Sequence, residues 1–274
     1  MKRYLFVSDL DLLLQRLERE PAVLVHVDAT RGSVPREAGT WMAVFADTVI
    51  ATIGGGRLEF DAIAHARAVL TDDTHELQVR YALGPSLGQC CGGDVQLRFE
   101  QVSPLEGADS ADLAARLRPL TVPVALFGGG HVGRALVQVL ATLPMVITWV
   151  DSRDEIFPKA MPANVQCEHS DPVQAAVATL VPHSRVLIMS FSHAEDLDIV
   201  AACLQRQREH GDLPYVGLIG SKTKWASFRQ RLQARGYSEA ELTHVTCPIG
   251  VPGIHDKRPE VIAVAVAAQL LQQG

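Results

Sequence analysis

Apolar residues in the first hundred positions follow two periods, which predict short strands and two helices. Residues 8–20 repeat leucines at helical spacing, with Ser8 or Asp9 as the N-cap, and residues 57–70 have the same period. Apolar runs predict strands at 22–28, 40–45, 48–53, 76–83 and 94–102, joined by loops rich in glycine. We therefore expect a small α+β domain over residues 1–105.

The pattern changes after residues 106–121, which show little periodicity, lie between Pro104 and Pro123 and are predicted to be a linker. Apolar runs at 122–127, 145–150, 185–190 and 215–219 then alternate with helical stretches at 131–143, 194–210, 222–235 and 259–272. Such alternation is typical of a doubly wound parallel sheet. The predicted fold class is α/β, with a Rossmann-like domain over residues 122–274.

Composition narrows the class of protein. The 274 residues are 47% hydrophobic and carry a net charge of −6, which argues against a nucleic-acid-binding protein. No run approaches the roughly 18 apolar residues that span a bilayer, so no membrane association is expected. Five cysteines, an odd number without a C-x-x-C pair, favour free thiols and a cytoplasmic protein over a disulfide framework or a four-cysteine zinc site.

The most specific general motif is G-x-G-x-x-G at residues 128–133, between a predicted strand and a helix. Gly128 would make the tight turn, Gly130 would let a phosphate approach the helix N-terminus, and Gly133 would let the helix pack closely. Asp151 ends the next strand, where it could bond a ribose hydroxyl, and His131 could face the ligand. Alternatively, the glycines only make a tight turn in a ligand-free scaffold.

A second glycine run, Gly54-Gly55-Gly56, precedes a helix but lacks the Lys-Ser/Thr of a nucleotide-binding P-loop. Its backbone N–H groups could point at an anion, or the run could be only a turn. Arg36 follows Pro35 in another loop, where its guanidinium could bind a phosphate or lie free on the surface.

A candidate metal contact lies in the motif Gln89-Cys90-Cys91-Gly92-Gly93. A thiol in a loop flanked by glycines can approach a soft metal. The alternative is a pair of small buried side chains. His193 follows a later strand end, where ligands of parallel sheets bind, although the preceding Ser192 could simply cap a helix.

The order of the motifs along the chain is itself informative, because together they form a family pattern. They occur as GSVPREAG, TIGGGRLE, LGQCCGG, FGGGHVGRAL, IGSKTK and CPIGVPGI. Over nearly its whole length the chain resembles the XdhC/CoxI family. The resemblance implies an accessory protein rather than an enzyme: a chaperone that binds molybdopterin carrying molybdenum and protects it. Such a protein supports sulfuration of the cofactor by a cysteine desulfurase and inserts it into apo xanthine dehydrogenase.

The resemblance also implies site residues and a homodimer. Cys91, directly before Gly-Gly, matches the family's cysteine and is the expected molybdenum contact, with Cys90 additional to that pattern. We expect the glycine loops and the cysteine loop to gather round one cofactor. Two other functions remain open: an NAD(P)-dependent oxidoreductase with a dinucleotide in the Rossmann site, and a cofactor-free scaffold. No Tyr-x-x-x-Lys set follows the glycine motif, which weighs against the first.

Overall fold

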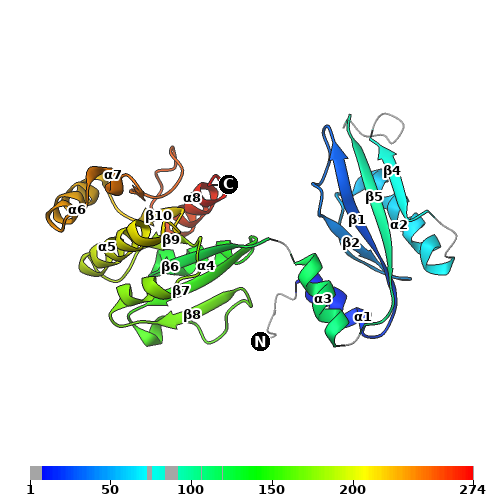
Figure 1. Cartoon of the computed structure of the whole chain (residues 1–274), viewed down its shortest axis with the longest axis horizontal. Helices are drawn as coiled ribbons and strands as arrows, with labels where there is room; N and C mark the ends of the chain where they lie inside the picture. The colour runs from blue at the N-terminus through cyan, green and yellow to red at the C-terminus, as the bar shows by residue number, and fades with distance from the viewer. Residues whose placement is uncertain (1–7, 73–75, 84–91, 106, 119, 274) are drawn as a thin grey trace. The chain divides into compact units, whose positions relative to one another are not determined.

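The computed structural model describes residues 8–72, 76–83, 92–105, 107–118 and 120–273. The chain divides into two compact units, Met1–Arg118 and Pro119–Gly274, each with its own core (Figure 1). Every helix within the described residues is too short or too polar to cross a bilayer.

Unit 1 is built on a five-stranded antiparallel sheet in the order β3-β2-β1-β5-β4. The strands are β1 (Ala22–Arg31), β2 (Trp41–Val44), β3 (Val49–Ala51), β4 (Gln78–Ala82) and β5 (Asp94–Val102). Residues on alternate sides of a strand face opposite layers. Val23, Val25 and Val27 pack under α2 (Gly56–Thr71), whereas Leu24 packs toward α1 (Asp9–Leu17).

The segment predicted as a linker contains a helix, α3 (Ala108–Leu117). Its Leu113 and Leu117 pack with Leu13 and Leu17 of α1, and α1 and α3 lie together at one end of the sheet (Figure 1). Its apolar stripe consists of only two buried leucines, too few to stand out as periodicity between the flanking prolines. The expectation of a linker over residues 106–121 was therefore wrong for most of its length.

Unit 2 is a six-stranded parallel sheet in the order β11-β10-β9-β6-β7-β8. The strands are β6 (Val122–Phe127), β7 (Met145–Asp151), β8 (Val165–His169), β9 (Arg185–Ile188), β10 (Tyr215–Leu218) and β11 (Val245–Thr246). The chain runs outward from β6 through β7 to β8, then returns and runs outward the other way from β9. The predicted Rossmann-like fold is confirmed, and its direction reverses between β6 and β9.

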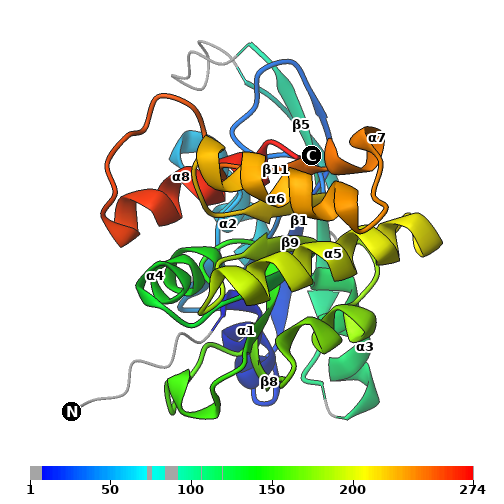
Figure 2. The ribbon, with the colours of Figure 1, turned by 90° about the vertical axis from the view of Figure 1, so that its left-hand side faces the viewer.

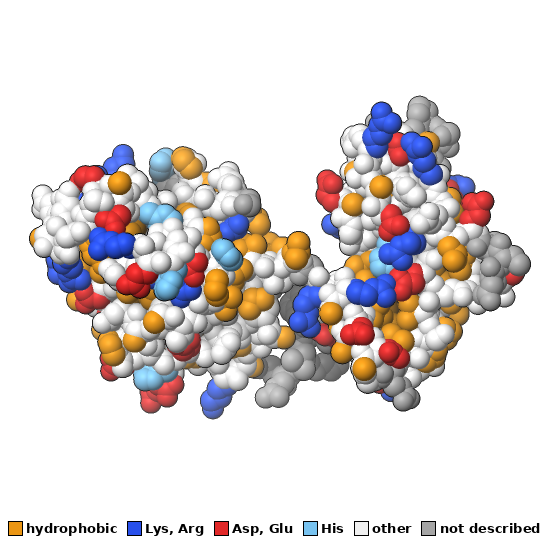
Figure 3. Space-filling view, viewed as in Figure 1, with side chains coloured by type: hydrophobic (Ala, Val, Ile, Leu, Met, Phe, Trp, Pro, Cys, Tyr) orange, Lys and Arg blue, Asp and Glu red, His pale blue; other side chains and the backbone are white. Residues whose placement is uncertain are grey.

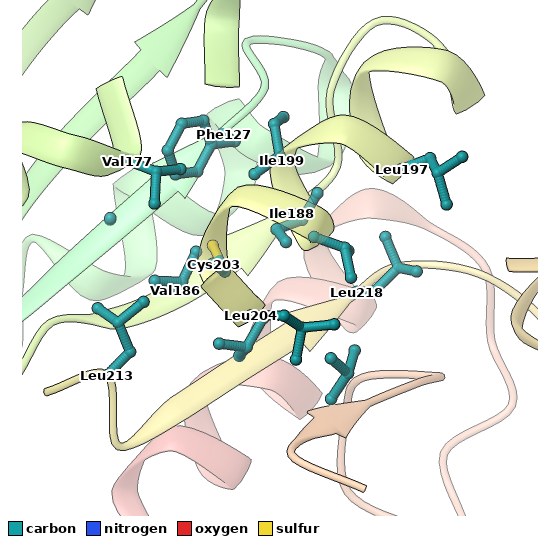
Figure 4. Close-up of a cluster of buried hydrophobic side chains, with 14 of the residues drawn as sticks. Phe127, Val177, Val186, Ile188, Leu197, Ile199, Cys203, Leu204, Leu213 and Leu218 are labelled. Carbon is teal, nitrogen blue, oxygen red and sulfur yellow. The ribbon is translucent and has the colours of Figure 1, made fainter. Parts of the chain in front are cut away.

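Helices cover both faces of this sheet. The helices α4 (His131–Leu140) and α8 (Pro259–Leu271) lie side by side over one face (Figure 2). The other face packs against η3 (Val173–Thr179), α5 (His193–His210), α6 (Lys222–Ala234) and α7 (Glu239–Leu242). Phe127, Ile188 and Cys203 lie in that second core (Figure 4), and burial raises the pKa of the Cys203 thiol to about 12. This thiol is fully buried and packs within the core.

Candidate functional site

The loop after β1 and the Gly54-Gly55-Gly56 run are in direct contact in unit 1. Gly54 has φ +118, and a Cβ there would lie 2.6 Å from Cβ of Pro35 and 3.4 Å from Cγ of Arg36. The Arg36 side chain is exposed. Folding thus brings the exposed Arg36 side chain next to the turn that begins α2.

The Gly54-Gly55-Gly56 turn is held by a carboxylate. Glu59 accepts the backbone N–H groups of Ile53 and Gly55, each at 3.0 Å, as well as the hydroxyl of Thr52. The N–H of Gly54 donates to Thr52 Oγ1 at 3.0 Å. The amides of Gly54 and Gly55 are therefore used inside the turn. The helix itself begins at Gly56 without a side-chain cap, so its first amides are the ones that an anion could reach.

The described end of the cysteine motif lies against the same loop. A Cβ at Gly93 would lie 2.4 Å from the carbonyl oxygen of Arg31 and 2.6 Å from that of Ser33. The strand register explains this approach, because Arg31 of β1 pairs with Asp94 of β5. Gln89, Cys90 and Cys91 lie outside the described residues.

Unit 1 therefore gathers three of the sequence motifs at one end of its sheet: residues 31–36 lie between Gly54 on one side and Gly93 on the other. Exposed arginines stand at this end of the unit (Figure 3), among them Arg31, Arg36 and Arg80. Arg80 is paired with Asp94, whose pKa it holds below the ordinary value.

In unit 2, two of the three motif glycines are fixed by close packing. A Cβ at Gly128, which has φ +124, would lie 2.0 Å from the Met189 carbonyl oxygen, and one at Gly133 would lie 2.0 Å from the Gly128 carbonyl oxygen. Gly130 is exposed, and a Cβ there would meet nothing within 4 Å. The open position lies just before α4, which has no side-chain cap and no acidic residue in its first turn. His131, the first residue of α4, is exposed.

Asp151 is turned into the protein. Its side chain is 1% exposed and accepts the N–H of Gly129 at 2.6 Å. It also accepts the backbone N–H, Nε and Nη2 of Arg153 at 2.9, 2.8 and 3.0 Å. Burial acts to raise the pKa of this carboxyl, but the bonds from Arg153 and Gly129 outweigh it and hold the pKa below 3.8. The carboxylate expected to bond a ribose thus holds the glycine loop instead.

His193 is the first residue of α5, and Ser192 caps that helix by accepting the Glu195 N–H at 3.2 Å. The histidine is exposed, with its ring edge-on to Phe228 at 6.3 Å between centroids. The capping role considered for Ser192 is confirmed, and His193 remains available at the surface.

Sequence reasoning missed Arg153, and it did not foresee that Asp196 and Lys224, each shortly after a strand end, form a buried ion pair. In that pair, Asp196 accepts Lys224 Nζ at 2.5 Å and also the Ser190 N–H and hydroxyl. The one sequence feature that could have pointed to the role of Arg153 is its position, two residues beyond the end of an apolar strand. Among the described residues, no group of three or more His, Cys, Asp or Glu side chains is placed to hold a metal ion.

Comparisons with known proteins agree with this architecture. The family model "XdhC Rossmann domain" matches residues 124–270, and "XdhC and CoxI family" matches residues 16–82. An uncharacterized protein of Escherichia coli K12, YqeB, is 25% identical over 256 residues; these are 92% of this chain and 43% of that protein, so the chain spans less than half of its curated relative.

A crystal structure described as a xanthine dehydrogenase from Bacillus halodurans has the same fold. Its TM-score is 0.74 at 20% identity, over 97% of this chain and 95% of the other. The model that matches unit 2 covers more than half of the chain, and the second model matches unit 1. The chain therefore belongs to the XdhC and CoxI family, with an XdhC Rossmann domain as its second unit.

Proposed function

We propose that this protein is a maturation factor for xanthine dehydrogenase and not itself an enzyme. It binds molybdopterin carrying molybdenum, protects it while a cysteine desulfurase supplies sulfur, and inserts it into the apoenzyme. Membership of the XdhC and CoxI family supports the role, and so does a structural relative described as a xanthine dehydrogenase. In this role the cofactor is cargo, so it has to be bound and then released.

One observation carries the proposal: residues 31–36 lie between Gly54 and Gly93 in unit 1. The cargo has an anionic phosphate and a soft metal. Arg36 suits the phosphate, because an exposed guanidinium favours an anion. Gly92 and Gly93 directly follow Cys91, the thiol that we assign to molybdenum.

The cofactor contacts that we propose in unit 1 also include Gln89, Cys90, Gly55 and Gly56. Those in unit 2 are Gly128, Gly130, His131, Gly133, Asp151 and His193, with Asp151 acting through the glycine loop that it holds. The functional form is a homodimer in the cytoplasm.

The cofactor site has to release its ligand as well as bind it, because a contact that never breaks would prevent delivery. A single thiolate on the metal and a separate contact to the phosphate satisfy both needs, since each contact can be exchanged separately.

The test of the proposal measures how well the loaded protein activates apo xanthine dehydrogenase. The protein is loaded with molybdenum-bearing molybdopterin, incubated with cysteine desulfurase and L-cysteine, and added to apo xanthine dehydrogenase. We expect faster and more complete activation than with the same amount of free cofactor. The Arg36→Ala variant should be impaired, and Arg19→Ala, an exposed arginine at the end of α1, is the matched control. Activation equal to that by free cofactor would contradict the proposed role.

A further inference from the structure

The crevice at the carboxyl ends of β6 and β9 is where a Rossmann domain holds a dinucleotide. Binding of the adenosine half needs the carboxylate at the end of the second strand to accept a ribose hydroxyl. An ionised carboxylate has about four acceptor positions. In Asp151 four donors occupy them: Gly129 N–H and three N–H groups of Arg153. No acceptor position is left for a ribose.

The same arginine also covers the space beside Asp151. Its guanidinium lies 4.5 Å from the centroid of the Phe191 ring. Arg153 follows β7 and Phe191 follows β9, and β6 lies between these two strands in the sheet. The stacked pair therefore passes over the carboxyl end of β6, where the glycine loop begins. A hydrogen bond also joins the segments that follow β7 and β9: Ser152 Oγ donates to Glu195 Oε1 at 2.8 Å.

The glycine loop is held on its other side as well. Arg134 donates to the carbonyl oxygens of Gly129 and Ile156, at 3.3 and 3.0 Å. A Cβ at Gly129 would lie 2.5 Å from Ile156 Cγ1, so the segment after β7 sits directly on the loop. What stays open is the short stretch at Gly130 and His131 together with the Phe191 ring, which is 67% exposed.

We propose that Arg153 is a specificity-determining residue that excludes adenosine dinucleotides from the Rossmann crevice. It does so by saturating Asp151 and by stacking on Phe191 across the end of β6. The phosphate of an incoming ligand can still reach the α4 N-terminus, but a ribose cannot reach its usual carboxylate. This exclusion does not rest on the proposed function. The exclusion stands on the contacts of Asp151 and Arg153.

The test measures binding of NAD⁺ and AMP by isothermal titration calorimetry on the full chain. Wild type should bind both only weakly. Arg153→Ala frees the Asp151 carboxylate and should bind NAD⁺ roughly ten- to a hundredfold more tightly, the range expected for a hydrogen bond to a charged group. Adding Asp151→Asn should reverse most of that gain. Arg134→Ala is the matched control: it removes the other arginine on the loop, leaves Asp151 saturated and should gain nothing.

Two outcomes would overturn the inference. One is micromolar NAD⁺ binding by wild type that Asp151→Asn abolishes, since Asp151 would then be a ribose ligand. The other is no gain in Arg153→Ala, since Arg153 would then not be what excludes the dinucleotide. If Arg153→Ala fails to fold, Arg153→Lys keeps the charge, frees part of the carboxylate and should show a smaller gain; an unchanged affinity there overturns the inference equally. No titration uses molybdopterin, so failed delivery to xanthine dehydrogenase would leave this result standing.

Discussion

Adding one methyl group at Gly133 of the Rossmann motif should destabilise the protein, whereas adding one at Gly130 should leave its stability almost unchanged. In Gly133→Ala the new Cβ would lie 2.0 Å from the Gly128 carbonyl oxygen, whereas ordinary van der Waals contacts begin at 3.4 Å. The obstacle is backbone, so α4 has to move away from the loop. In Gly130→Ala the methyl meets nothing within 4 Å, and its backbone, φ −68 and ψ −173, suits any residue.

The size of the effect follows from two opposing contributions. Overpacking of this kind costs up to about 3 kcal/mol. Replacing a glycine inside a helix by alanine returns about 1 kcal/mol. The expected net loss for Gly133→Ala is about 2 kcal/mol, which in a domain of about 150 residues lowers Tm by about 4–8 °C. Gly130→Ala should change the free energy of unfolding by no more than about 0.5 kcal/mol.

The assay is calorimetric unfolding of the full-length wild type and both variants in one buffer. The reasoning fails if Gly133→Ala unfolds together with wild type, because the close approach of α4 to the loop would then not exist. It fails equally if Gly130→Ala is as unstable as Gly133→Ala, because Gly130 would then be packed and not open to a ligand.

Three further substitutions test the contacts that shape the two glycine loops and the carboxyl edge of the unit 2 sheet. The folded-state pKa of Asp151 is depressed, so its contribution is present above its ordinary value of 3.8 and is lost as pH falls through the folded pKa. Asp151→Asn should therefore lower the free energy of unfolding at pH 7 by about 2 kcal/mol and make that free energy fall less steeply below pH 4. The same fall below pH 4 in the variant and in wild type would contradict this. Lys224→Met leaves Asp196 buried without its cation and should cost about 3 kcal/mol in urea unfolding, and wild-type stability would refute the pairing. Glu59→Ala removes the acceptor of the Gly55 N–H and should lower the free energy of unfolding by about 1–3 kcal/mol. Equal urea midpoints for the variant and wild type would contradict this.

The sequence predicts best those elements whose apolar residues repeat and whose ends carry caps. Residues 122–127 form β6 as expected, and Ser8 caps α1 in a capping box with Asp11. Strand β8 (Val165–His169) was missed because only its first residue is fully buried, so it lacks an apolar run. Strand β11 and helix α7 are too short to show any period.

The sequence led us to expect that the glycine and cysteine loops gather, but it did not show which contacts bring them together. The meeting of residues 31–36 with Gly93 depends on the register that pairs Arg31 with Asp94, which local sequence does not show. Spacing alone put Asp151 at a strand end. It could not show that the chain turns Arg153 back onto that carboxylate, because this turn depends on packing against the loop after β9.

The central claim is that this chain carries the molybdenum cofactor, with Cys91 as the metal contact. Its most direct test is the molybdenum and pterin content per chain of protein isolated from a molybdate-supplied host. The account predicts molybdenum together with pterin in wild type, a marked loss in Cys91→Ala, a smaller loss in Cys90→Ala, and no loss when the exposed Arg19 is replaced by alanine. Retained nicotinamide without molybdenum would favour an oxidoreductase, and neither ligand would favour a scaffold. Equal molybdenum in wild type, both single cysteine variants and the double variant would contradict the assignment of the thiol.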